Sequence, residues 1–268
     1  LRKRHCLFMR KKILIITPFY HGIGGAETYC QGLVKEAKKN FDIEVLILDD
    51  SFKNWQGTDF KAAFGMAYIL WCKGWAICDV DIIHAQGLIA AFVGILLKRR
   101  LRARKLLVTI LALYDFKNKP RWFKWFCQWV LNHADKIFVE GETGREDLLN
   151  CGVKENKLIT FMHWVDLDRF KPSGEKHKGI TVLFAGRPIH IKGKHIIEAV
   201  EKRLFHIKDV RFIYVENVPY EDLPNYYQMA DICVVPSLYS EGISRVVLEA
   251  AASGCAVITS NKALYQNS

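Results

Sequence analysis

The sequence predicts an α/β protein built from two parallel sheets, one in each half of the chain. Apolar, β-branched runs of strand length alternate with amphipathic segments of helix length, which is the pattern of parallel strands joined by helices. A polar stretch from Lys171 to Gly179 interrupts this alternation, lacks apolar periodicity and contains both proline and glycine. We therefore expect an N-terminal domain over residues 9–172 and a C-terminal domain over residues 173–268.

Six strands and the helices between them account for the N-terminal half. The first strand, Ile13 to Phe19, leads through a glycine-rich turn into a helix expected from about Ala26 to Lys39. Further strands are expected at residues 43–48, 82–85, 105–111, 136–140 and 158–162. Met9 is the expected natural start, which leaves residues 1–8 without a structural role.

A shorter series of the same kind follows the polar stretch. Strands are expected at residues 181–185, 211–215, 232–235 and 256–259, with helices near 194–205, 223–229 and 245–253. In open parallel sheets, ligands bind beyond the carboxyl ends of the strands. The loops that directly follow these strands are therefore the places to look for functional side chains.

Composition favours a folded protein with reduced thiols and an anionic partner. Apolar residues make up 50% of the chain and charged residues 25%, which is sufficient for packed cores. The eight cysteines form no C-x-x-C pair, so neither a zinc cluster nor a disulfide framework is expected, and a cytoplasmic location fits best. The net charge of +11 indicates an anionic partner. The apolar run Leu88 to Leu97 is too short to span a bilayer.

The loop after residue 185 is the first candidate ligand site. Arg187 and Lys192 lie between Gly186 and Gly193, on a loop that enters a helix. A pyrophosphate suits this pattern, because arginine forms bidentate contacts and lysine supplies a mobile point charge. The alternative is that both cations are ordinary solvated loop charges.

The loop after residue 235 is the second candidate. Gly242, Ile243 and Ser244 precede an almost wholly apolar helix, and Ser244 is the expected N-cap residue. Free backbone N–H groups at this helix start could bind phosphate or sugar oxygens at the positive end of the helix dipole. Glu241 could accept hydrogen bonds from sugar hydroxyls or could be a solvent-exposed loop acid.

Glu249 is unusual because it lies among apolar residues of that helix. A carboxylate in a buried segment is costly unless it is paired or hydrogen-bonded. Ribose hydroxyls would satisfy it. An ion pair with Arg245, four residues earlier on the same helix face, would satisfy it equally well.

These motifs together resemble glycosyltransferase family 4. Glu241 and Glu249 have the glutamate, seven residues, glutamate spacing of that family, and the Gly186-Arg187 loop with Lys192 is similar to its diphosphate-binding segment. A weaker likeness includes Gly24 and Gly25, which resemble the family's first glycine-rich loop. The resemblance implies the GT-B fold, in which two Rossmann-like domains face a cleft, and it spans about residues 12 to 260.

The resemblance also implies a function. It implies a retaining transfer of a sugar from a nucleotide-sugar donor to a lipid-linked or envelope glycan acceptor, without a metal or other cofactor. Arg187 and Lys192 would contact the diphosphate, Glu249 the ribose and Glu241, as the catalytic residue, the transferred sugar. The backbone at residues 242–244 would donate hydrogen bonds. Relatives continue beyond four strands in the second sheet, so we expect the C-terminal domain to be truncated.

Two departures from the family pattern favour an alternative. Only Asp115 remains of a His-Asp pair that the family places after the fourth strand, and His163-Trp164 stands where Asn-Gly is usual. The missing histidine, together with a short second domain, makes a catalytically silent subunit that binds a nucleotide sugar the second interpretation. An NAD-dependent oxidoreductase is a third, resting on the glycines at 22, 24 and 25, but Glu27 occupies the position where the dinucleotide fingerprint needs glycine.

A basic and aromatic segment from Lys98 to Lys124 suggests a second partner. It has ten basic residues against one acid, Asp115, and tryptophan and phenylalanine residues follow closely. Aromatic residues interleaved with cations suit an anionic lipid interface, so we expect peripheral attachment to the inner face of the cytoplasmic membrane. The alternative is that the aromatic residues pack into the core. No nucleic-acid readout motif is recognised.

Overall fold

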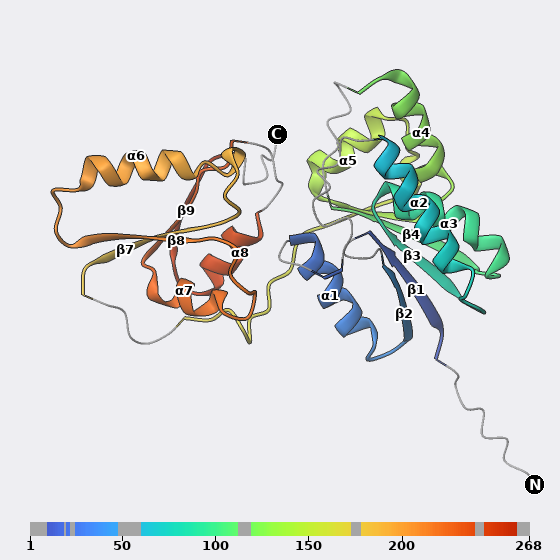
Figure 1. The fold of residues 1–268 in the computed structure, drawn as a ribbon, viewed down its shortest axis with the longest axis horizontal. Coiled ribbons are helices and arrows are strands. Elements are labelled where there is room, and N and C mark those ends of the chain that lie inside the picture. Colours follow the sequence, from blue (N-terminus) through green and yellow to red (C-terminus); the bar gives the residue numbers. More distant parts are fainter. Residues whose placement is uncertain are drawn as a thin grey trace, which may run out of the picture. The chain divides into compact units, whose positions relative to one another are not determined.

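The computed structural model describes residues 10–18, 20–21, 25–47, 60–111, 119–172, 178–238 and 244–261. The chain divides into two compact units (Figure 1). One unit takes the described residues up to Leu111 and those of Asp115–Val139 and Leu148–Ile159; the other takes Glu140–Asp147 and the described residues from Thr160 onward. The expected boundary at residue 172 lies within the second unit.

The first sheet has six strands in the order β2-β1-β3-β4-β5-β6, and the pairings along it from β2 to β5 are parallel. All six strands expected in the N-terminal half are present. Their bounds are β1 Lys12–Thr17, β2 Asp42–Ile47, β3 Ile82–Gln86, β4 Lys105–Ile110, β5 Lys136–Glu140 and β6 Leu158–Phe161.

Helices cover both faces of this sheet. Helix α1 lies on one face, where Cys30 and Val34 pack on Ile15 of β1. Helices α2, α3 and α4 lie side by side on the other face (Figure 1). Right-handed crossovers account for this division, because the chain steps from β1 to β2 in one direction and from β3 onward in the other. The bounds are α1 Gly25–Ala37, α2 Phe60–Gly74, α3 Leu88–Arg100, α4 Arg121–Asn132, α5 Gly141–Asn150 and the 3-10 helix η3 Glu155–Lys157.

The second sheet has four strands in the order β10-β9-β7-β8, all parallel. Its core gathers around the fully buried side chains of Phe170 and Tyr227. The strands and helices expected in this half are confirmed. The bounds are β7 Ile180–Ala185, η4 His190–Lys192, α6 Lys194–Leu204, β8 Val210–Val215, α7 Leu223–Met229, β9 Ile232–Val235, α8 Arg245–Ala252 and β10 Ala256–Thr259.

The described helices are all too short or too polar to cross a membrane. The apolar run from Leu88 to Leu97 forms most of α3, which is buried against the sheet over most of its length. Its last turn carries three cations, so the apolar part ends where the helix reaches the surface.

The same aspartate contact fixes the strand register in both sheets. Asp81, Asp135 and Asp231 each lie one residue before a strand. Each carboxylate accepts a hydrogen bond from a backbone N–H of the neighbouring strand, over 2.8–3.0 Å. The backbone N–H of each aspartate donates to the carbonyl of that same neighbouring residue, over 2.8–2.9 Å. The two bonds together hold adjacent strands in one register.

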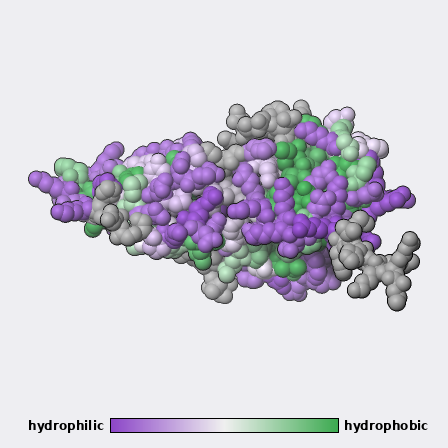
Figure 2. Space-filling view, turned by 90° about the horizontal axis from the view of Figure 1, so that it is seen from below, coloured by the Kyte–Doolittle hydropathy of each residue, from purple (hydrophilic) through white to green (hydrophobic). Residues whose placement is uncertain are grey.

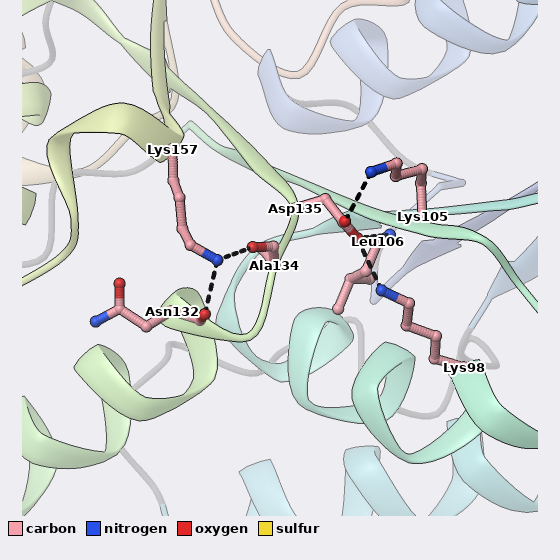
Figure 3. A network of polar contacts seen from close by, with 7 residues as sticks. All are labelled: Lys98, Lys105, Leu106, Asn132, Ala134, Asp135 and Lys157. Atoms are coloured by element: carbon pink, nitrogen blue, oxygen red, sulfur yellow. Dashed lines mark hydrogen bonds and ion pairs between the residues drawn. The ribbon is translucent and has the colours of Figure 1, made fainter.

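Asp135 has the largest set of such contacts (Figure 3). Besides the Leu106 amide, its carboxylate accepts from Nζ of Lys98 at 2.8 Å and Nζ of Lys105 at 3.1 Å. Nearby, Nζ of Lys157 donates to the carbonyls of Asn132 and Ala134, which ties the end of α4 to η3. Burial raises the pKa of Asp135, but the lysine and amide hydrogen bonds outweigh it and hold that pKa at about 2.

We predict that Asp135→Asn lowers the free energy of unfolding at neutral pH by about 1 kcal/mol, a modest value because solvent screens this quarter-exposed carboxylate. The folded-state pKa lies below the ordinary value of 3.8, so the stabilisation is present above about pH 4 and is lost as the pH falls towards 2. Urea unfolding of both proteins from pH 7 to pH 3 measures this. A constant difference across that range would contradict the charge assignment.

Candidate functional site

The loop after β7 carries the first pair of predicted ligand residues. Gly186 continues the ladder by donating to the carbonyl of Val215 over 3.0 Å, and Arg187 then leaves the sheet with an exposed side chain. Lys192 lies at the end of η4 and is half-buried. The side chain of Arg187 makes no ion pair or hydrogen bond with the described part of the chain, which leaves its guanidinium available to an anion.

Gly193 joins this loop to the loop that follows β9. Its φ of 76° is in the left-handed region, and a Cβ built there would collide with the backbone carbonyl of Pro236. A backbone hydrogen bond from the Leu238 amide to the Ile191 carbonyl, 2.9 Å long, fixes the same approach. The two candidate loops, about 45 residues apart in sequence, are therefore adjacent at the carboxyl edge of the second sheet.

Glu249 lies in the apolar helix α8 and is only 3% exposed. One carboxylate oxygen accepts from the hydroxyl of Tyr227 at 3.1 Å and the other from the guanidinium of Arg245 at 3.2 Å. Burial raises the pKa of Glu249, and Arg245 and Tyr227 oppose that rise. The ion pair with Arg245 that the sequence left open is thus formed. The role of Glu249 at a ribose stays a prediction.

Arg245 is in turn held by two aromatic rings. Its guanidinium lies 5.2 Å from the ring centre of Tyr220 and 5.8 Å from that of Trp164, and it donates to the Tyr220 hydroxyl at 2.7 Å. Burial raises the pKa of Tyr220 to about 12, so this hydroxyl stays protonated. Arg245 therefore links the segment before the second sheet to α8.

His163 and Trp164, which replace the usual Asn-Gly of the family pattern, both contact side chains of other elements. Trp164 contacts Arg245, while Nε2 of His163 lies 3.2 Å from the carboxylate of Glu140 at the end of β5. Glu140 is 6% exposed, and its second carboxylate oxygen has no hydrogen-bond partner within the described part of the chain. The two unusual residues at this turn thus each contact an ionisable side chain of another element, His163 that of Glu140 and Trp164 that of Arg245.

Ser244 occupies the N-cap position of α8, as expected, and is buried. Its side chain makes no capping hydrogen bond, while its carbonyl accepts from the Val247 amide at 3.0 Å.

The glycine-rich loop of the first sheet is described only in part: Gly25 is the first residue of α1. Five predicted site residues lie outside the described residues: Gly24, Asp115, Glu241, Gly242 and Ile243.

A row of buried polar side chains lies at the carboxyl edge of the first sheet. Thr17 and Gln86 end the adjacent strands β1 and β3, and Thr109 is the last residue but one of the next strand, β4. All three are at least nine-tenths buried. Neither amide atom of Gln86 has a hydrogen-bond partner within the described residues. Thr109 contacts Nε2 of His84 at 2.8 Å, and burial lowers the pKa of His84 to about 4. Of these three side chains, Gln86 is the one whose polar atoms all lack a hydrogen-bond partner within the described residues.

Sequence reasoning missed several of these residues. Tyr220 and Tyr227 lie in loop and helix segments with no motif that would single them out. A buried glutamate does predict that some hydrogen-bond donor must approach it, and this signal could have been used. Gln86 ends a strand at the ligand-binding edge, which is a signal that could have selected it. Trp164 was noticed only as a departure from a pattern.

Solved structures with the same arrangement define the class of fold. A HepE protein from Anabaena, in complex with UDP and glucose, is 16% identical with a TM-score of 0.69, and the match covers 93% of this chain and 80% of that one. The sucrose-phosphate synthase of Thermosynechococcus elongatus is 18% identical with a TM-score of 0.69, covering 93% and 81%. These likenesses show that the chain has the GT-B fold.

Family models then identify the chain more closely. The model of Glycosyltransferase Family 4 matches residues 23–169, and the model of Glycosyl transferases group 1 matches residues 166–266. The first match covers more than half of the chain, so the chain belongs to glycosyltransferase family 4. Spore coat protein SA of Bacillus subtilis (strain 168) is 26% identical over 140 residues. The matched segment makes up 46% of this chain and 35% of the relative, so the match spans about a third of the relative's length.

We predict that Gly193→Ala destabilises the second sheet by about 2 kcal/mol or more, because the new Cβ combines an unfavourable φ with a collision at Pro236. Gly65→Ala is the control. Position 65 is inside α2 with open space around it, so alanine there should stabilise by about 0.5–1 kcal/mol. Chemical denaturation of the three proteins measures both. Effects of the same sign would refute the loop-junction argument.

We also predict strong coupling between Arg245 and Glu249. Arg245→Met or Glu249→Leu alone should each cost about 3 kcal/mol, because each leaves a buried charge unpaired. The double variant should recover most of this loss, since it removes both charges. A double-mutant cycle by urea unfolding gives the coupling free energy, and additive single effects would show that the pair contributes nothing to stability.

Proposed function

We propose that this chain is a retaining glycosyltransferase that takes a sugar from a nucleotide-sugar donor bound at the second sheet. The observation that supports the proposal is the junction of two loops at Gly193, where the loop that carries Lys192 and the exposed Arg187 approaches Pro236 and Leu238 after β9. Family membership and neighbours solved with UDP support the same donor class. A nucleoside diphosphate matches both the charge and the hydrogen-bonding groups present.

Charge stabilisation by the protein supplies the proposed catalysis. As the bond from the anomeric carbon to the diphosphate breaks, negative charge accumulates on the departing phosphate oxygens. Arg187, Lys192 and the N-terminal amides of α8 would stabilise this charge, so the proposal requires no metal. The acceptor hydroxyl would bond to the anomeric carbon on the face that the diphosphate leaves, and its proton would pass to the departing diphosphate. Glu241 would bind the transferred sugar, and Glu249 the ribose.

A glycan acceptor, lipid-linked or part of the cell envelope, completes the proposal. Gln86 supports it, because its unpaired amide offers one donor group and one acceptor atom in a buried setting. Two neighbouring sugar hydroxyls present the complementary pair. The relative described as a spore coat protein is consistent with an envelope product. We further propose that transfer occurs at an anionic membrane surface on the cytoplasmic side.

A silent nucleotide-sugar-binding subunit is the second candidate. The closed contacts of Glu249 favour it, because both carboxylate oxygens already have protein partners. Turnover separates the two possibilities: release of free nucleoside diphosphate from a panel of UDP-, GDP- and ADP-sugars in the presence of glycan acceptors is expected only of a transferase. Binding without release would favour the silent subunit.

We predict that Arg187→Ala weakens the affinity for the preferred nucleoside diphosphate about tenfold or more, the effect of losing a charge-assisted hydrogen bond. Lys202→Ala is the matched control, since Lys202 is an exposed cation in the last turn of α6. Calorimetric titration of UDP, GDP and ADP against both variants measures the effect. If Arg187→Ala and the control bind equally, the diphosphate site is elsewhere.

A further inference from the structure

Glu216 is an acidic residue at the edge of the second sheet where the donor is proposed to bind. It directly follows β8, and the backbone N–H of Gly186 donates to the carbonyl of Val215 over 3.0 Å, so the start of the Arg187 loop lies beside it. The chain turns at Asn217, whose φ of 53° is in the left-handed region that asparagine tolerates. An acid at this place needs an explanation, because it would repel the phosphates of a diphosphate.

The side chain of Glu216 is held by the protein and is not an ordinary surface acid. Hydrophilic side chains cover most of the face of the second unit that Figure 2 shows at the left, so an exposed acid in this unit carries no signal by itself. Glu216 differs, because its side chain is only 24% exposed and its Oε1 atom is buried. Partial burial of a carboxylate is costly unless donors compensate it.

Lys194, the first residue of α6, fixes one oxygen of this carboxylate. Its Nζ lies 2.9 Å from Oε1 of Glu216 and 3.6 Å from Oε1 of Glu198. Two carboxylates therefore share one lysine, and Lys194 does not need Glu216 to balance its own charge. The second oxygen of Glu216, Oε2, makes no ion pair or hydrogen bond with the described part of the chain. That oxygen has two lone pairs with which to accept hydrogen bonds from a ligand.

The loop that carries Glu216 also reaches the contacts of α8. Tyr220, four residues after Glu216, accepts from the guanidinium of Arg245 at 2.7 Å, and Arg245 pairs with Glu249 at 3.2 Å. Four residues of chain extend over at most about 14 Å. Under the proposed function Glu249 binds the ribose, and the base is joined directly to the ribose. The base would therefore lie within reach of Glu216.

The hydrogen-bonding pattern of a carboxylate discriminates among the bases. An ionised carboxylate only accepts hydrogen bonds. Guanine presents two adjacent donors, N1–H and the N2 amino group, whereas uracil presents one N–H between two carbonyl oxygens. Adenine and cytosine each place a ring-nitrogen acceptor beside their amino group. A carboxylate therefore matches guanine and repels an acceptor atom of each of the other three bases.

We propose that Glu216 selects guanine, so that the donor of this chain is a GDP-sugar. The inference rests on the proposed nucleotide-sugar site and adds the identity of its base. Guanine N1–H and N2–H would donate to Oε2 of Glu216, while Lys194 holds the other oxygen. Charge-assisted hydrogen bonds of this kind are among the stronger ones in proteins. The negative charge of Glu216 would then face the base, while Arg187 and Lys192 face the phosphates.

Calorimetric titration of the full chain with GDP, IDP, UDP and ADP tests the proposal. IDP carries hypoxanthine, which is guanine without the N2 amino group. GDP should bind at least about tenfold more tightly than UDP, ADP or IDP, because each of the others lacks a hydrogen bond to a charged acceptor. Glu216→Gln should weaken GDP binding about tenfold and reduce the preference for GDP over IDP to about threefold or less, since a neutral amide oxygen accepts more weakly.

Glu221→Gln is the matched control. Glu221 is an exposed acid on the same loop, so this variant makes the same change of charge and should keep the preference for GDP over IDP. That preference compares two ligands on one protein, so partial unfolding of a variant does not alter it. If the pair of Lys194 and Glu216 were only structural, Glu216→Gln would lower the midpoint of thermal unfolding and leave the preference unchanged.

The outcomes separate this inference from the proposed function. UDP or ADP binding as tightly as GDP would overturn the guanine assignment and leave the nucleotide-sugar site standing. A preference for GDP over IDP that survives Glu216→Gln would overturn the role of Glu216. Failure of all four diphosphates to bind would overturn the proposed donor site, and the guanine assignment with it.

Discussion

An aspartate one residue before a strand sets the geometry of both sheets. Asp81, Asp135 and Asp231 each exchange two hydrogen bonds with the neighbouring strand, one through the carboxylate and one through the backbone. A parallel strand that slipped by one residue would lose both bonds and turn its apolar side chains to the wrong face. Because register fixes where each strand ends, these contacts also fix the edge at which the functional loops emerge.

At that edge, the second sheet carries side chains that are already bound within the protein and one arginine that is exposed to solvent. Glu249 is buried and Arg245 is mostly buried, and they bind each other and tyrosine hydroxyls, so they hold α8 against the preceding segment. Arg187 is exposed on the adjoining loop. Under the proposed function, Arg187 would bind the charged ligand from a solvated position, while the buried polar groups behind it already have protein partners.

Charge count alone would have misjudged the surface of the first unit. Lys98, Lys105 and Arg100 belong to one basic run, yet all three are used within the protein, two at Asp135 and one at the end of α2. The cations that remain for a partner are therefore fewer than the sequence suggests. Solvent exposure and existing partners, not the number of cations, decide what such a segment can bind.

The sequence by itself determined the order of strands and helices, because alternation of apolar and polar residues reports local structure directly. It also selected Arg187, Lys192 and Glu249, whose residue types follow strands or interrupt an apolar helix. The spacing of Arg245 and Glu249 predicted their ion pair as one alternative, and the structure shows that it forms. Tertiary structure alone decided that Gly193 joins two distant loops and that Tyr227 reaches Glu249. Those facts depend on which segments pack together, and spacing along one chain carries no information about contacts made by another segment.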